Sequence, residues 1–560
     1  MKQLLKPFAL LIIGVILINL LASKWYARFD LTKDNRYTIS PVATDLANQL
    51  ENTLVIDVFL DGELPAEFRK LKSETKQILE EYSAINPDIK YNFINPIEDL
   101  EGNAVDQVTA KLAQYGIKPA MATIMDGGKS TKVIVFPWAM LTYKGTITAV
   151  PLLKTVARSN MEERVNSSIQ QLEYQFADGI KKVTTQKSQT IAMLRDSGQL
   201  SNLQLNDFIK SLQQYYRVAP FGIEFVTTND SVTAQDVLNQ LNKFDLVIEA
   251  KPTIAYSETK KYVLDQYIMN GGKLLLAADP IIFENDSLAN PQGIGYGLNR
   301  DLNIDDLLFK YGLRLNSGIV KDERSGFMAL ASGSGRNTQY DAFQWPYYPI
   351  SKSIDDHPIT KNVEDIKFEY TGTIDTLKNG IDKTVLIKTS PKSLVKILPA
   401  RISLEELDQP IDPLATLSPE QPLAVLAQGT FTSAYRNRVK PEVIKNSKDQ
   451  SATASIVLIA DGDIMKNQID RGQPQELGYD IRTGALYGNK EFLMNTVNYL
   501  LDDTGIIELR NKNISIPFLD TEKSYDQRTK WQVINVILPL VLLGMFGWLF
   551  NFMRKRNYNH

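Results

Sequence analysis

Two apolar blocks, one at each end of the chain, set the strongest limit on what this sequence can fold into. The first covers residues 7–22 (PFALLIIGVILINLLA) and the second covers residues 533–552 (VINVILPLVLLGMFGWLFNF). Both are close to the length that a helix needs to cross the hydrocarbon core of a bilayer. A cleaved signal peptide is the alternative for the first block, but Leu20 is a poor −3 residue for cleavage after Ala22. We therefore predict a membrane helix at each terminus.

Basic residues after the second block predict the orientation of the chain. Arg554, Lys555 and Arg556 follow the apolar run, and such clusters favour the cytoplasmic side of a membrane. With two spans, both termini then lie in the cytoplasm, and the long polar region between the spans lies outside the cytoplasmic membrane.

Small residues interrupt the second block. Gly544 and Gly547 lie one turn apart and follow Pro539. Small residues let helices approach closely in lipid, so both glycines are candidates for contact with a partner helix. The alternative is the ordinary tolerance of membrane helices for glycine and proline.

The composition removes several functional classes. The 560 residues carry 62 Lys and Arg against 65 Asp and Glu, so no excess of positive charge favours nucleic acid as a partner. The absence of cysteine removes disulfides, iron–sulfur clusters and cysteine nucleophiles. Two histidines, His357 and His560, are few for a zinc site or a Ser/His triad. We predict no metal and no cofactor.

The sequence also lacks a complete nucleotide-binding motif. Gly128-Lys129-Ser130 matches the end of a P-loop, but Thr123 occupies the position of the first glycine. The segment is typical of a hairpin turn and not of the loop between a strand and a helix. We predict that the chain neither binds nor hydrolyses ATP.

Alternating β-rich and amphipathic segments predict an α/β class for the region between the spans. Residues 54–62 and 89–94 are predicted strands that flank a predicted helix over 65–85, the pattern of a parallel βαβ crossover. Residues 122–136 predict a hairpin near the edge of that sheet, and a helix over 161–183 follows.

A second α/β series begins near residue 189. Short apolar runs alternate with helical segments, which predicts an open, mostly parallel sheet covered on both faces. Its predicted elements are a strand over 222–227, helices over 206–215, 234–241, 257–269 and 490–501, and strands within 244–252, 273–280 and 455–467. Residues 325–447 are rich in Pro, Gly and Ser and predict a β-rich insertion.

These patterns predict six regions. They are an N-terminal membrane helix (1–29), a first α/β domain (30–185), a second α/β domain with insertions at about 325–447 (186–505), a membrane-proximal linker (506–530), a C-terminal membrane helix (531–553) and a basic cytoplasmic tail (554–560).

Acidic residues at predicted strand ends are the main candidates for a site. Asp279 follows one buried run, and Asp461 and Asp463 follow another. Open parallel sheets bind ligands beyond the carboxyl ends of their strands, where paired carboxylates can hold magnesium or act as acid and base. The alternative is local capping of turns and helices. This alternative is the one we favour from the sequence.

Three aromatic residues, two glycine-rich runs and one histidine are weaker candidates for a functional role. Trp345, Tyr347 and Tyr348 are candidates for contact with a protein or a glycan, and packing within their own domain is the alternative. The glycine-rich runs 293–297 and 332–337 predict flexible loops. His357 is expected in a surface turn.

Several ordered phrases resemble one known family. RFDLTKDNRYTIS (28–40), LEEYSAINPDIKYNFINP (79–96), MNGGKLLLAADP (269–280) and LNIDDLLFKYGLRLNSGIVKD (302–322), between two terminal membrane helices, resemble the GldG-type gliding-motility auxiliary component of an ABC transporter. The resemblance implies a non-catalytic auxiliary subunit in the bacterial inner membrane. It also implies a polytopic permease and a separate cytoplasmic ATPase as partners, and a link to gliding motility and its associated protein secretion.

The resemblance also implies that the middle domain is similar to amidotransferase-type α/β folds. Those folds use a cysteine nucleophile, which this chain lacks.

Two alternatives remain open at this point. An envelope enzyme acting on glycan or peptide would need Asp279, Asp461 or Asp463 to converge in one concave pocket. A solute-binding receptor would need a deep interdomain cleft lined by aromatic and polar side chains.

Overall fold

The computed structural model describes residues 14, 30, 38–126, 129–154, 160–185, 187–224, 232–332, 339–354, 357–412, 415–502, 504–511 and 525–558. The first predicted membrane helix lies outside the described residues, apart from Gly14. Contacts within the chain define two compact units, Met1–Lys512 and Asn513–His560. The first unit contains helices and several sheets, which confirms the predicted α/β class.

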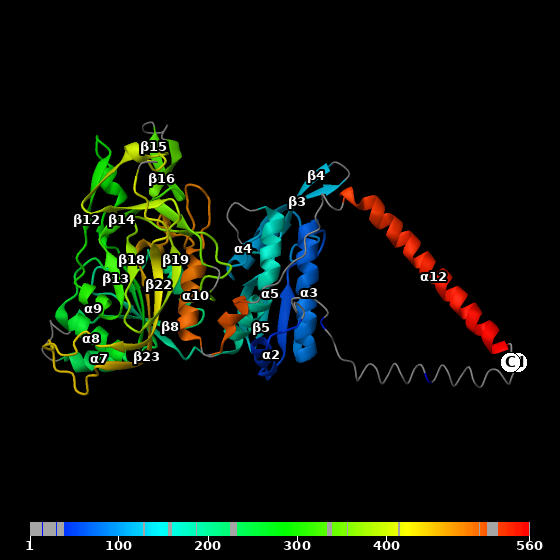
Figure 1. The fold of residues 1–560 in the computed structure, drawn as a ribbon, viewed down its shortest axis with the longest axis horizontal. Helices are drawn as coiled ribbons and strands as arrows, with labels where there is room; N and C mark the ends of the chain where they lie inside the picture. Colours follow the sequence, from blue (N-terminus) through cyan, green and yellow to red (C-terminus); the bar gives the residue numbers. More distant parts are fainter. Residues whose placement is uncertain are drawn as a thin grey trace. The chain divides into compact units, whose positions relative to one another are not determined.

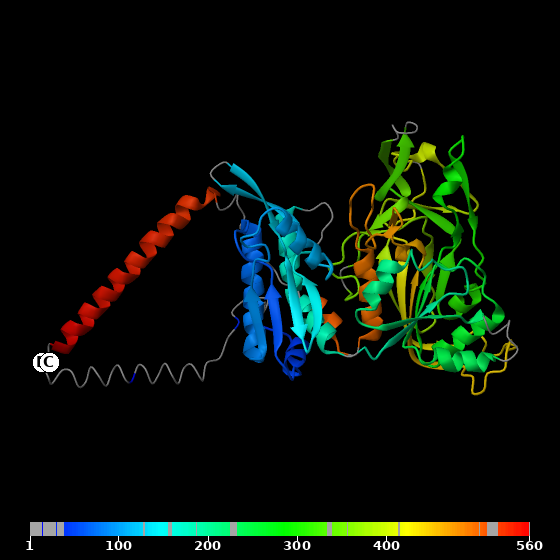
Figure 2. The ribbon, with the colours of Figure 1, turned by 180° about the vertical axis from the view of Figure 1, so that it is seen from behind.

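The N-terminal part of the first unit contains a four-stranded sheet with the order β2-β1-β5-β6. Its strands β1 and β2 are parallel and joined by α3, as the sequence predicts. Helices α3 and α5 pack together on one face of this sheet (Figure 1), and the strands are seen from the other side in Figure 2. The elements of this part are α2 (Pro41–Asn48), β1 (Leu54–Val58), α3 (Ala66–Ile85), β2 (Ile89–Phe93), α4 (Asn103–Ala113), β3 (Ala120–Asp126), β4 (Lys129–Val135), β5 (Trp138–Tyr143), β6 (Thr146–Pro151) and α5 (Met161–Thr184).

The predicted hairpin does not lie at the edge of this sheet. Strands β3 and β4 pair with each other in a separate two-stranded sheet. A second hairpin, β5–β6, pairs with β1 instead. Every second residue of β5 is buried, including Ala139 and Leu141, so this hairpin has an apolar face to place against α5.

The larger part of the first unit is built on a seven-stranded sheet with the order β19-β22-β23-β10-β9-β7-β8. The five strands from β23 to β8 are parallel to their neighbours, and β22 and β19 are antiparallel. The elements are β7 (Thr190–Leu194), α6 (Asn206–Leu212), β8 (Arg217–Phe221), α7 (Ala234–Leu241), β9 (Leu246–Ala250), α8 (Glu258–Met269), β10 (Lys273–Ala277), β19 (Asp382–Lys388), β22 (Pro422–Thr432), β23 (Gln450–Ile459) and α10 (Asn489–Leu501).

Successive side chains of the central strands enter two different cores. In β10, Leu274 and Leu276 pack with helices α7 and α8, whereas Leu275 and Ala277 pack with α6 and α10. A strand covered on both faces needs apolar residues at every position. This requirement explains the uninterrupted apolar runs in the sequence.

Two sequence-based predictions in this part are wrong. The strand predicted over 222–227 lies at Arg217–Phe221, where Pro220 is tolerated because β8 is the edge strand of the sheet. The glycine run predicted as a loop forms β12 (Ile294–Asn299), which pairs with two other strands. A Cβ at Gly295 would lie 2.7 Å from the ring of Phe283, so the absence of a side chain at this position lets the strand pack closely against Phe283. The other glycine run lies outside the described residues except for Ser332.

Short sheets and a third apolar core lie beyond the main sheet. Trp345 and Tyr347 are fully buried in this core. The elements are β11 (Ile281–Ile282), β12, α9 (Asp305–Lys310), β13 (Leu313–Asn316), β14 (Gly318–Asp322), β15 (Ser325–Ser332), β16 (Gln339–Ser351), β17 (Ile366–Lys367), β18 (Thr373–Thr376), β20 (Ser393–Ile397) and β21 (Ala400–Ser403).

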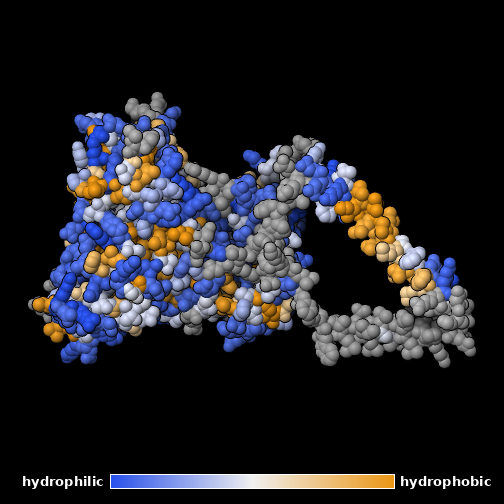
Figure 3. All heavy atoms as spheres, viewed as in Figure 1, coloured by the Kyte–Doolittle hydropathy of each residue, from blue (hydrophilic) through white to orange (hydrophobic). Residues whose placement is uncertain are grey.

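The second unit contains the long helix α12 (Arg528–Tyr558). Residues Arg528–Lys555 are long and apolar enough to cross a membrane, and none of this stretch is buried. Figure 3 shows the hydrophobic middle of this helix with hydrophilic residues at both ends. A Cβ at Gly544 or Gly547 would have no atom within 4 Å, so both positions are open to a partner or to lipid.

Candidate functional site

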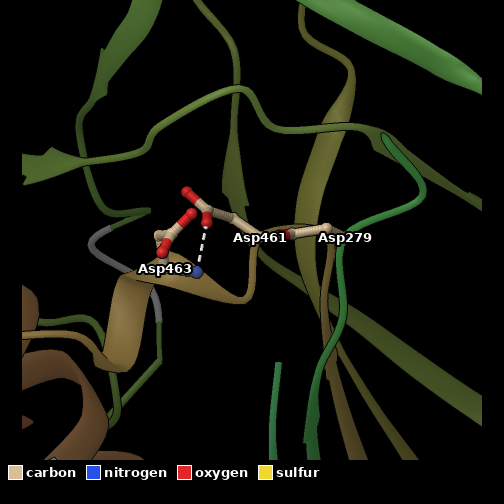
Figure 4. Close-up of side chains that lie close together, drawn as sticks. All are labelled: Asp279, Asp461 and Asp463. Carbon is tan, nitrogen blue, oxygen red and sulfur yellow. Dashed lines mark hydrogen bonds between the residues drawn. The ribbon is translucent and has the colours of Figure 1, made fainter. Parts of the chain in front are cut away.

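The three acidic candidates come together at the carboxyl ends of two neighbouring strands. Asp279 follows β10, and Asp461 and Asp463 follow β23, which is paired with β10. One oxygen from each lies within 4.8 Å of the others (Figure 4). The backbone N–H of Asp463 donates to the Asp461 carboxylate over 2.7 Å. Asp461 therefore caps the local turn, as the favoured alternative predicted, and the three carboxylates also lie close together.

A lysine from the adjacent strand completes this cluster. Lys251 directly follows β9, and its Nζ lies 2.5 Å from Asp463, 3.0 Å from Glu284 and 3.4 Å from Asp279. Its φ of 56° is in the left-handed region, which few non-glycine residues adopt. Gly462 allows the approach, because a Cβ there would lie 2.6 Å from the Lys251 side chain. We call Lys251, Asp279, Asp461 and Asp463 the strand-end cluster.

Burial controls how the carboxylates of this cluster titrate. Burial and the nearby charge of Asp463 raise the pKa of Asp279 to about 6, although Lys251 opposes them. Burial also raises the pKa of Asp461 well above its usual value, and the charges of Asp279 and Asp463 add to this effect. Burial would raise the pKa of Asp463 as well, but Lys251 and Lys466 lower it overall. Of the three carboxylates, Asp463 is therefore the one that keeps its negative charge furthest into acid.

The donor set of the cluster does not fit a metal ion. Both oxygens of Asp461 accept backbone N–H groups, from Glu369 and Asp463. Asp279 accepts the N–H of Gly462 and faces Lys251, and Asp463 faces Lys251 and Lys466. Each carboxylate oxygen thus lies near a backbone N–H or an ammonium group, although Asp463 Oδ1, 3.2 Å from Lys466 Nζ, accepts no hydrogen bond. The ammonium group of Lys251 supplies the positive charge that a cation would bring.

A cavity of about 300 Å³ adjoins the strand-end cluster. Of the three aspartates, only Asp463 lines it. Its aromatic lining consists of Phe327, Tyr348, Tyr479 and Tyr487, and its charged lining consists of Lys367, Glu369, Asp463, Lys466, Asp480 and Arg482. This volume is at the lower end of the range for small-molecule sites.

The charges along the cavity alternate in sign. Lys367 Nζ lies 3.3 Å from Asp480 and 3.0 Å from Glu369, and Lys466 Nζ lies 3.2 Å from Asp463. Burial lowers the pKa of Lys466, but Asp463 and, more weakly, Glu369 raise it overall, so Glu369 acts on both lysines. Along the cavity wall the charged side chains therefore follow one another in the spatial order Asp480, Lys367, Glu369, Lys466 and Asp463.

The usual ligand position in a doubly wound sheet is closed in this chain. Strand order reverses between β7 and β9, and such a point normally opens a crevice. Here Lys260 of α8 fills it, with Nζ 2.9 Å from Asp196 and 3.2 Å from Glu249. The side chains of Lys260 and Glu249 have no exposed area, and Asp196 has almost none. We call Asp196, Glu249 and Lys260 the switch-point cluster.

The aromatic candidates are buried. Trp345 donates from Nε1 to Tyr370 over 3.1 Å, and the hydroxyl of Tyr347 lies 3.0 Å from Glu406. They pack within their own domain and do not form an exposed contact surface. Tyr348 is also buried, but its side chain lines the cavity. His357 is half-buried against the ring of Tyr499, and burial lowers its pKa.

The sequence did not indicate Lys251, Lys367, Glu369 or Lys466. Lys251 follows a buried strand as the aspartates do, so its position was a usable signal. Lys367 and Glu369 come from the insertion, and nothing in the local pattern places them near β23.

Comparison with known proteins gives two family matches. A family model described as an ABC-type uncharacterized transport system matches residues 188–496, and a domain of unknown function matches residues 33–142. An uncharacterized protein of Borreliella burgdorferi is 23% identical over 551 residues, which cover 95% of this chain and 94% of that protein.

Two solved structures show weaker likeness. The N-terminal domain of mmIFT52 is 13% identical, covers 56% of this chain and 97% of its own, and gives a TM-score of 0.32. A putative ThuA-like protein from Parabacteroides merdae is 12% identical, covers 55% of this chain and 99% of its own, and gives a TM-score of 0.23. At these scores neither likeness informs the fold or the function.

Proposed function

Because the chain belongs to the ABC transporter auxiliary family, described as an ABC-type uncharacterized transport system, we propose that it is a non-catalytic, membrane-anchored auxiliary subunit of an ABC transporter-type complex. Its partners are a polytopic permease and a separate cytoplasmic ATPase. The complex serves gliding motility and the linked protein secretion. The chain couples the permease and the ATPase to partners outside the cytoplasm.

The family match over residues 188–496 is the observation that carries this proposal. Helix α12 supplies the membrane anchor that an auxiliary subunit needs. The proposed topology has a second span near the N-terminus and both termini in the cytoplasm of a bacterial inner membrane. It is supported by the apolar block at 7–22 and the basic residues after α12.

A non-catalytic role is supported by the state of the carboxylates. Asp279, Asp461 and Asp463 converge, as an envelope enzyme would require. Only Asp463 lines the cavity, however, and it faces the ammonium groups of Lys251 and Lys466, while both oxygens of Asp461 and one oxygen of Asp279 accept backbone N–H groups. A general base or a metal ligand needs an oxygen that substrate or metal can reach.

Co-purification of the full chain from mild detergent tests the proposal. We expect a permease and an ATPase to be recovered with it, identified by mass spectrometry. Recovery of the chain alone, under conditions that keep other ABC complexes intact, would contradict the proposal.

The glycines of α12 offer a sharper form of this test. Gly544→Leu with Gly547→Leu should reduce recovery of the permease by at least about tenfold, or about 1.4 kcal/mol, because bulky side chains prevent close helix packing. Met545→Leu lies on the same helix and changes volume little, so it should leave recovery unchanged. Equal recovery with both variants would show that the glycine face meets only lipid.

The cavity favours a second function, that of a solute-binding receptor. It has the aromatic and polar lining that this alternative requires, although all its lining residues belong to the predicted second α/β domain and it is not the interdomain cleft expected from the sequence.

A further inference from the structure

The cavity beside the strand-end cluster has a charged wall with no net charge. Six charged groups line it, three acidic and three basic, so their charges cancel: Asp480, Lys367, Glu369, Lys466 and Asp463, which alternate in sign, and Arg482. Lys251 lies behind Asp463, outside the lining. Such a wall gives little attraction to a simple anion or a simple cation. It is complementary to a ligand that carries both charges a few ångströms apart.

Two members of this wall remain accessible from the cavity. The side chains of Glu369 and Lys466 are 28% and 33% exposed, whereas those of Lys367, Asp463 and Asp480 are each below 10%. The buried members hold the accessible ones in place, because Lys367 pairs with Glu369 and Asp463 pairs with Lys466. One carboxylate and one ammonium group in the lining of the same cavity are thus partly exposed.

The remaining lining supplies apolar contact and a further cation. Phe327, Tyr348 and Tyr487 provide rings, and Met328 and Ala329 of β15 provide aliphatic surface. Arg482 is exposed at the cavity, with its guanidinium 4.0 Å from the ring centre of Tyr340. A planar guanidinium suits a carboxylate ligand.

We propose that this cavity binds a small zwitterionic solute, an amino acid or a short peptide with free termini. Glu369 receives the ammonium group of the ligand, Lys466 and Arg482 receive its carboxylate, and the aromatic wall receives its side chain. The proposal develops the receptor function named above and does not depend on the ABC transporter complex, because ligand binding and co-purification of partners are measured separately.

Binding to the full chain in detergent tests the proposal. The probes are the common L-amino acids, a library of dipeptides with free termini, the same dipeptides acetylated and amidated at their ends, and glucose. We expect at least one zwitterionic probe to raise the unfolding temperature and to bind saturably by calorimetry. Capping both termini should weaken binding at least about tenfold, because each lost charge-assisted hydrogen bond costs about that much or more.

Variants of the lining locate the site. Glu369→Gln and Lys466→Gln should each weaken binding about tenfold or more. Ala329→Phe should remove binding by filling the cavity without a change of charge. Lys388→Gln serves as the matched control, because Lys388 pairs with Glu420 on an exposed surface. If a charge variant fails to fold, the capped probes and Ala329→Phe still decide the outcome.

Three results would overturn the proposal. They are equal binding of capped and free dipeptides or of glucose, undiminished binding by Ala329→Phe, and no saturable binding of any zwitterionic probe below about 10 mM.

Discussion

The switch-point cluster and the strand-end cluster lie at the same edge of one sheet and contain the same kinds of side chain, yet the first is almost completely buried and the second adjoins the cavity of about 300 Å³. In the first, Lys260 reaches in from a helix and pairs with Asp196 and Glu249 with no exposed area of its own. In the second, Asp463 connects the buried Lys251 to the accessible Lys466. Charged side chains therefore gather at the carboxyl ends of the parallel strands. At the switch point, Lys260 of helix α8 closes the position that a ligand would occupy.

Asp196 of the switch-point cluster and Asp279 of the strand-end cluster respond to pH in opposite directions. Burial raises the pKa of Asp196, but Lys260 and two backbone N–H groups lower it overall. Its contribution to stability is therefore present at neutral pH and lost in acid. The pKa of Asp279 is raised to about 6, so its protonated form is favoured by folding and the corresponding stability is lost as pH rises.

Loss of the buried lysine in the switch-point cluster should have the largest effect. Lys260→Met leaves Asp196 and Glu249 buried without their cation, which should lower the free energy of unfolding by about 3–5 kcal/mol. The measurement is the denaturation midpoint of the detergent-solubilised full chain at pH 7. The triple variant Lys260→Met, Asp196→Asn and Glu249→Gln should recover much of the loss, because no unpaired charge remains. If the triple variant is as unstable as the single one, the loss of stability comes from altered packing at the switch-point cluster and not from unpaired charge.

Asp279 gives the next largest effect, and it depends on pH. The folded chain keeps the Asp279 proton up to about pH 6, whereas the ordinary value is 3.8. The stability from this proton is full below pH 3.8 and is lost between there and pH 6. Asp279→Asn removes the titration, so the variant should gain up to about 3 kcal/mol relative to the natural chain between pH 4 and pH 7. A difference in unfolding free energy that does not change with pH would contradict the raised pKa.

Lys251 should matter less than Lys260. Lys251→Met should cost about 2 kcal/mol at pH 7, below the usual range for a broken buried pair, because Asp463 keeps Lys466 and Asp279 can take up a proton. The cost should shrink at pH 5, where Asp279 is mostly protonated. Unfolding of this variant at both pH values tests the expectation. An equal or larger cost at pH 5 would mean that the two clusters do not differ as described.

Much of the main sheet could be predicted from the sequence, because helix caps and apolar runs in this region indicate the same elements that the structure shows. Ser257 caps α8 by accepting the N–H of Lys260, and the apolar run 273–277 forms β10. Continuous apolar runs of this length predict strands covered on both faces, and the two cores confirm it. The predicted domain boundaries and the proposed roles of the candidate residues stay predictions.

The site could be predicted only in part, because its other half comes from distant segments. The aspartates at strand ends follow from the sequence, but the insertion that supplies Lys367 and Glu369 lies far along the chain from β10. Lys260 looks like an ordinary exposed residue in the first turn of a helix, and its complete burial depends on which strands are neighbours. Gly295 of β12 is another case in which the sequence-based prediction was wrong, since its role is to make room for Phe283.

An exposed ion pair provides the baseline for this comparison and the smallest expected effect. Lys388 of β19 lies 2.8 Å from Glu420, and their side chains are 38% and 53% exposed. Exposed pairs contribute little because water and salt screen them and because both long side chains lose freedom, so Lys388→Gln should change the free energy of unfolding by less than about 0.5 kcal/mol. The same denaturation measurement checks it, with and without added salt. A cost that matched that of Lys251→Met would mean that burial does not rank the three pairs, and the contrast between the closed and the accessible cluster would then need another cause.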